Sequence, residues 1–151
     1  MKYLALLTPF LLGATAAPVT QDTNTVGSIR HFRASTNPNS SGASISYLVE
    51  ITDQVRTYCY YSDETSGPKL PNVGQIYCDN PDVKWQFNQD PSPPHTEGRY
   101  RIVVIYTSPE SPHVVTAGFH EWDPSDFSLQ GDGASVGTVY QGAPNFVLDN
   151  A

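Results

Sequence analysis

Basic residues, cysteines and long apolar stretches are all scarce in this sequence. Eight Lys and Arg residues stand against 15 Asp and Glu residues, which gives a formal net charge of -7 at pH 7. The few basic residues are scattered along the chain, whereas binding to phosphate backbones or to anionic membranes depends on clustered Lys and Arg. We therefore expect neither a nucleic acid nor a membrane surface as a partner.

The apolar stretch at the N-terminus is too short to cross a bilayer. It runs from Leu4 to Leu12, and small residues follow it up to Pro18, whereas a membrane-spanning helix needs about 20 apolar residues. A short apolar core followed by small residues is typical of a cleaved signal peptide. We expect residues 1–17 to be this signal peptide, with cleavage after Ala16 or Ala17, and the product to be secreted and extracellular.

The rest of the chain has the size of one domain. Residues 18–25 are polar and without periodicity, and we interpret them as a flexible leader. Residues 26–151 are enough to bury a substantial core. We expect them to form a single β domain.

Alternation of apolar and polar residues dominates the chain after residue 26. The clearest run, residues 43–51, would place Ile45, Tyr47 and Val49 on one face, and residues 98–106 repeat the pattern. Period-two alternation bounded by Gly, Pro, Asn and Ser predicts half-buried strands. The expected strands are 29–33, 43–51, 55–61, 74–78, 83–87, 98–106, 113–121, 135–140 and 145–148.

Helical spacing is absent after the signal peptide, apart from one possible short turn at residues 124–127. Many short strands separated by turn signals favour a sandwich or a barrel. The predicted fold is all-β, a single-domain antiparallel β-sandwich or β-barrel with one disulfide.

Cys59 and Cys78 are the only cysteines. An exported chain meets an oxidising compartment, so we expect a disulfide between them. Closing a loop of about 20 residues stabilises a fold by roughly 3 kcal/mol in the chain-entropy model. Metal ligation is the alternative, but no Cys-x-x-Cys pair or suitably spaced His accompanies them. We expect Cys59 near a strand end, tethering the loop 62–72, and we expect no metal or cofactor.

No motif for nucleophilic catalysis is present. The sequence has no Gly-x-Ser-x-Gly elbow, and a disulfide would leave no free thiol. His113 and His120 are seven residues apart on one expected strand, so they would face opposite sides. A secreted hydrolase or ribonuclease-like enzyme that uses His120, Glu121 and either Arg99 or Arg101 remains an alternative.

Tyr58 and Tyr60 are the best candidates for an exposed aromatic pair. Both would lie on the face opposite Cys59, where they could bind a host protein or a sugar. Aromatic residues on strands more often pack in a core, and a carbohydrate-binding module is a further alternative. Asn39 begins an Asn-Ser-Ser sequon in an expected loop, which is a weak signal for glycosylation.

Several segments together resemble a known family. They are an opening strand at 29–32, Ile76-Tyr77-Cys78, Trp85-Gln86-Phe87, the apolar run 100–106, Val114-Val115-Thr116-Ala117, and Asp126-Phe127-Ser128-Leu129-Gln130-Gly131. In this order they resemble the secreted fungal proteins typified by the major Alternaria allergen. The resemblance implies an antiparallel β-barrel or sandwich, no catalytic constellation, and a role as an allergen, elicitor or virulence effector that binds a host protein.

The sequence also departs from that family. The typical member has a second disulfide, and the best-known allergen has an early cysteine that links a dimer, whereas this chain has two cysteines in all. We therefore exclude a covalent dimer and expect a monomer. The leading hypothesis is a secreted, non-enzymatic protein that acts by binding.

Overall fold

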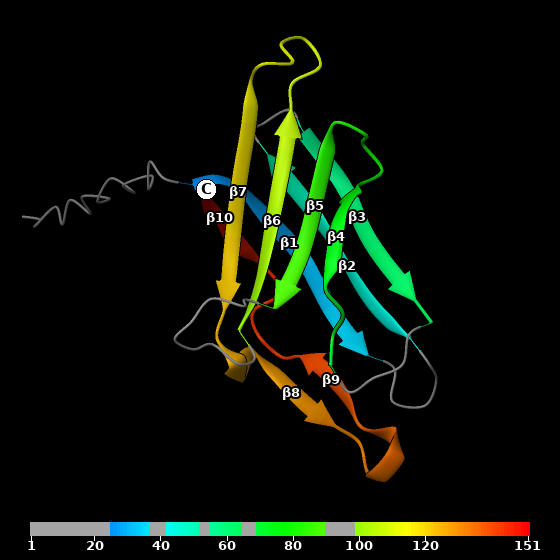
Figure 1. Ribbon diagram of the computed structural model, residues 1–151. Helices are drawn as coiled ribbons and strands as arrows, with labels where there is room; N and C mark the ends of the chain where they lie inside the picture. Colours follow the sequence, from blue (N-terminus) through cyan, green and yellow to red (C-terminus); the bar gives the residue numbers. More distant parts are fainter. Residues whose placement is uncertain (1–24, 37–41, 52–54, 65–68, 90–98) are drawn as a thin grey trace, which may run out of the picture.

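The protein forms an almost entirely β structure, seen in a computed structural model (Figure 1). The structure describes residues 25–36, 42–51, 55–64, 69–89 and 99–151. The strands are β1 (Thr25–Thr36), β2 (Ala43–Ile51), β3 (Val55–Asp63), β4 (Val73–Tyr77), β5 (Val83–Gln89), β6 (Tyr100–Thr107), β7 (Val115–Trp122), β8 (Phe127–Gln130), β9 (Gly137–Tyr140) and β10 (Phe146–Asn150). The predicted all-β antiparallel fold with one disulfide is confirmed.

Helical structure in the described residues is limited to two 3-10 turns. They span Pro124–Asp126 and Gly133–Ser135, and the first agrees with the short turn that the sequence predicts. No helix in the described part of the chain is long and apolar enough to cross a membrane. The expected signal peptide, the leader up to residue 24 and Asn39 lie outside the described residues.

The strands form one antiparallel sheet that curls into a nearly closed barrel. Their order is β3-β2-β1-β10-β7-β6-β5-β4, and the β8–β9 hairpin is attached through a pairing of β9 with β1. The first and last strands of the chain are neighbours, since Ile29 pairs with Phe146. The two edges of the sheet are therefore β3 and β4, and the disulfide lies between them.

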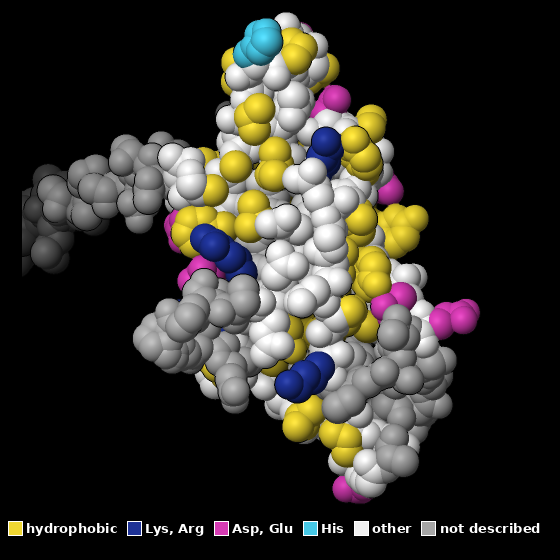
Figure 2. Space-filling model, viewed as in Figure 1, with side chains coloured by type: hydrophobic (Ala, Val, Ile, Leu, Met, Phe, Trp, Pro, Cys, Tyr) yellow, Lys and Arg dark blue, Asp and Glu magenta, His cyan; other side chains and the backbone are white. Residues whose placement is uncertain are grey.

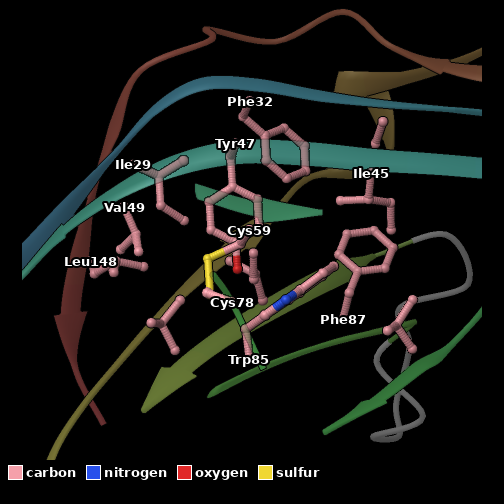
Figure 3. Close-up of a cluster of buried hydrophobic side chains, with 14 of the residues drawn as sticks. Ile29, Phe32, Ile45, Tyr47, Val49, Cys59, Cys78, Trp85, Phe87 and Leu148 are labelled. Atoms are coloured by element: carbon pink, nitrogen blue, oxygen red, sulfur yellow. A yellow bond between two sulfur atoms is a disulfide. The ribbon is translucent and has the colours of Figure 1, made fainter. Parts of the chain in front are cut away.

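The core fills the inside of this curved sheet (Figure 3). The alternation in β2 has the predicted effect, because Ile45, Tyr47 and Val49 are fully buried. Trp85 and Phe87 of β5 meet them from the opposite wall, with the Trp85 ring edge-on to Tyr47 at 5.2 Å between centroids. Burying one side chain of this size contributes roughly 1.5–3 kcal/mol.

A bulge in β1 directs the Phe32 side chain toward a cluster of aromatic rings. The register between β1 and β2 shifts between Arg30 and Arg33, and His31 has a φ of 57°. The backbone N–H of His31 donates to Oδ1 of Asn145 at 3.0 Å. The Phe32 ring is 2% exposed and packs 4.7 Å from the Trp122 ring. The bulge at His31 therefore connects β1 to Asn145, the residue before β10.

Candidate functional site

The Cys59–Cys78 disulfide joins the two edges of the barrel. The two Cα atoms are 4.3 Å apart, and both residues are buried. The position of Cys59 corrects the expectation from sequence, because it lies in the middle of β3 and not near its end. Cys78 directly follows β4, so the bond connects two edge strands and does more than tether the loop 62–72.

Two hydrogen bonds support the disulfide at this junction, which we call the seam. The Asp79 N–H donates to the Tyr58 carbonyl at 2.9 Å. The Asn80 N–H donates to the Thr57 hydroxyl at 2.9 Å, and Thr57 is itself buried. The turn after β4 is thus fixed against the middle of β3.

Tyr58 and Tyr60 project outward beside the disulfide. Because side chains alternate along a strand, the inward position of Cys59 places both neighbours on the outer face. Tyr58 is 45% exposed and Tyr60 is 58% exposed. Their rings are 6.3 Å apart between centroids and inclined by 26°. The structure therefore places this pair at the surface, as the sequence predicts.

Tyr77 is a third exposed aromatic residue at the seam, which the sequence reasoning did not select. It is 59% exposed, and the ammonium of Lys84 lies 5.0 Å from the centroid of its ring. Consecutive Cα atoms are about 3.8 Å apart. Tyr77 precedes Cys78, Tyr58 and Tyr60 flank Cys59, and the Cα atoms of the two cysteines are 4.3 Å apart. The Cα of Tyr77 therefore lies within about 12 Å of the Cα atoms of Tyr58 and Tyr60.

We call Tyr58, Tyr60 and Tyr77 the tyrosine surface. Figure 2 shows apolar side chains projecting from the side of the molecule where β3 and β4 lie. Across β2, Tyr58 pairs with Leu48 and Tyr60 pairs with Ser46. The residues that face the two tyrosines on β2 are therefore uncharged, whereas Arg56 is the next outward residue before Tyr58 on β3 itself.

Arg30, Glu50 and Arg56 form a charged cluster on the outer face of the sheet. Glu50 accepts a hydrogen bond from Nε of Arg30 at 3.0 Å and lies 3.4 Å from Nε of Arg56. The pKa of Glu50 is lowered, chiefly by the hydrogen bond from Arg30. With two arginines and one carboxylate, this cluster carries one net positive charge at neutral pH, and it borders the tyrosine surface through Arg56.

The residues of the alternative enzyme site do not converge. Glu121 faces outward and forms an ion pair with Arg101 at 3.3 Å, while Arg99 lies 3.5 Å from Asp123. His120 precedes Glu121 on β7, so its side chain points to the other side of the sheet. No arrangement of a base, an acid and an arginine around one space results.

His120 instead packs against the start of β10, the strand that pairs with β7. Its ring stacks on Phe146 at 4.2 Å between centroids. Burial lowers its pKa, against smaller opposing effects of the Asp149 charge and a hydrogen bond to the Val147 backbone. His113 lies in the turn before β7 and is exposed. Within the described ranges, no three His, Cys, Asp or Glu residues are grouped as metal ligands would be.

Comparison with known proteins adds no family to these observations. No family model matches the chain, and no curated protein matches it either. The resemblance to the Alternaria allergen family therefore stays a prediction from sequence.

Proposed function

We propose that this protein is a secreted, non-enzymatic fungal effector, elicitor or allergen-like protein that acts by binding a host protein. The observation that carries the proposal is the tyrosine surface, where three aromatic rings are 45–59% exposed around one fixed junction. Tyrosine is enriched at protein interfaces because its ring supplies apolar contact area and its hydroxyl supplies a hydrogen bond.

The rigidity of this surface favours binding. Tyr58 and Tyr60 lie on a strand whose nine residues pair with β2 in an unbroken register. Tyr77 is held in a two-stranded contact with β5, opposite Lys84. Aromatic side chains on a fixed backbone lose little conformational freedom on binding, so more of the contact energy appears as affinity.

The test is capture of partners from host extract and from extracellular fluid by the purified, oxidised mature protein, with identification by mass spectrometry. A Tyr58→Ser/Tyr60→Ser double variant is compared with wild type. Leu129→Ser is the matched control, because Leu129 is 66% exposed but belongs to the β8–β9 hairpin. Tyrosines at the centre of an interface contribute about 2 kcal/mol or more, so we expect the double variant to lose at least about 30-fold in affinity.

The contrary outcomes are distinct. Equal capture by wild type and the double variant would place the binding site elsewhere. Capture of no specific protein would refute the host-protein function. Retention on chitin, glucan or cellulose would then indicate the carbohydrate-binding alternative, and turnover of RNA or glycan that His120→Ala abolishes would indicate the enzyme.

A further inference from the structure

The seam is the one place where neighbouring strands of the described barrel are joined without a ladder. The other neighbouring strands share residue pairs, for example seven between β5 and β6, two between β7 and β10 and one between β1 and β9. Between β3 and the end of β4, the described residues provide the disulfide and the two hydrogen bonds from Asp79 and Asn80. Figure 1 shows β3 and β4 running apart from this junction. The disulfide is therefore the covalent link across the seam, in addition to the packing of the core beneath it.

Each part of the tyrosine surface is attached to one side of this link. Tyr58 and Tyr60 flank Cys59 on β3, and Tyr77 precedes Cys78 on the other side. The Tyr58 backbone also provides the carbonyl that holds Asp79. The seam therefore helps to set the position of Tyr77 relative to the other two tyrosines, together with the pairing of Tyr77 with Lys84 of β5.

We infer that the Cys59–Cys78 disulfide is a redox switch for the tyrosine surface, an inference that rests on the proposed binding function. Cys59 and Cys78 are buried, so exchange requires a local opening that exposes the bond. A small thiol would then attack one sulfur, forming a mixed disulfide and releasing the other cysteine as a thiolate that takes up a proton. A second thiol molecule then releases the first cysteine. The protein gains two thiols, and the two reductant molecules become one disulfide.

After reduction, the seam has no covalent link and is held by the packing of the buried Cys59 and Cys78 side chains and by hydrogen bonds. Two hydrogen bonds remain, and both can be exchanged for bonds to water when the turn at residues 79–80 separates from β3. The rest of the barrel keeps its ladders and its core. The tyrosine surface is thus assembled in an oxidising compartment and separates into two parts in a reducing one.

Hydrogen exchange of individual amides, measured by NMR on the oxidised protein and on the protein reduced with dithiothreitol, tests the switch. Removing the bond raises the equilibrium constant of global unfolding on the order of 100-fold in the chain-entropy model, so amides throughout the sheet lose some protection. If the seam also opens locally, we expect the Asp79 and Asn80 amides to lose at least about ten-fold more protection than the amides in the ladder of β5, β6 and β7. Reduction of folded protein avoids a cysteine variant that fails to fold.

A Thr57→Val variant is the matched control within the seam. It removes the hydroxyl that accepts from Asn80 and keeps the disulfide, with a side chain of nearly the same shape. In the oxidised state we expect faster exchange at Asn80 and unchanged exchange at Asp79. Loss of protection at Asp79 as well would show that the disulfide does not hold the seam closed by itself, and this result would overturn the inference.

Two further results on the wild type would overturn it. Unchanged protection of Asp79 and Asn80 after reduction would show that the seam stays closed without the bond. An equal loss across β5, β6 and β7 would show that the disulfide stabilises the whole fold and is not a local switch. Both results are independent of any partner.

Capture experiments in both redox states separate the inference from the proposed function. If the oxidised protein captures no partner, the proposed function fails, while hydrogen exchange still decides whether the seam opens. If oxidised and reduced protein capture the same partner equally well, the function stands and the switch is refuted. Loss of the partner on reduction, together with local exchange at the seam, supports both.

Discussion

Gly118 of β7 is a position where one added methyl group should disturb the barrel. A Cβ atom there would lie 2.3 Å from Cγ2 of Val26 and 2.9 Å from Cβ of Leu148. Carbon atoms pack favourably at about 3.5–4.0 Å, so β1 or β10 must move away from β7. Overpacking of this kind costs about 1–3 kcal/mol. We expect Gly118→Ala to lower the free energy of unfolding by that amount, measured by urea unfolding followed by tryptophan fluorescence.

Gly74→Ala is the matched control for this experiment. Gly74 lies in β4, is exposed, and a Cβ there would meet no atom within 4 Å. Both variants make the same chemical change in a strand, so the effect on the unfolded chain is similar and the difference isolates the clash. If Gly118→Ala unfolds at the same urea concentration as Gly74→Ala, the close packing of β7 against β1 and β10 is wrong.

Two histidines give further predictions. His31 has a φ of 57°, which costs a residue with a Cβ about 1–2 kcal/mol. In urea unfolding, His31→Gly should therefore be at least as stable as wild type, and His31→Val should be clearly less stable. A His31→Val variant as stable as wild type would contradict the positive φ at this position. Because burial lowers the pKa of His120 below its ordinary 6.5, the unfolded chain binds the proton more tightly. The contribution of His120 is present above pH 6.5 and is lost as the pH falls through the folded pKa. Between pH 7.5 and 5, the urea midpoint of unfolding should therefore drop more in wild type than in His120→Gln. Equal drops would show that His120 does not contribute to the loss of stability at low pH.

Local alternation was enough to predict the strands that have one buried face. β2 occupies the predicted residues 43–51, and β3, β5 and β6 begin or end within two residues of the predicted positions. These strands carry alternate apolar side chains over five residues or more, so the period can be counted. β8 has two such residues, Phe127 and Leu129, and was not predicted.

The order of the strands could not be predicted, because it depends on which edges meet. The pairing of Ile29 with Phe146 joins residues from opposite ends of the chain. Nothing in either short segment identifies its neighbour, since backbone hydrogen bonding is the same for every strand. The strand that begins the domain, predicted at 29–33, extends over Thr25–Thr36 because β2, β9 and β10 all pair with it.

The candidate site was predicted only in part, because the order of the strands could not be predicted. Tyr58 and Tyr60 follow from alternation around Cys59, whereas Tyr77 could not be joined to them before the two edges of the sheet were known. A signal for Tyr77 did exist. Once Cys78 is taken as a buried half of a disulfide, period-two alternation turns the residue before it outward.

This rule links the fold of the barrel to its surface. A disulfide between edge strands points into the core, so the neighbours of its cysteines on each strand must project outward at the same junction. Aromatic residues there cannot add to the core, and large exposed aromatic rings are a feature of binding surfaces. The exposure of the tyrosines beside Cys59 and Cys78 is the basis on which we propose a binding function. If stability were their role, replacing Tyr58 and Tyr60 with serine would lower the free energy of unfolding as much as a core substitution does.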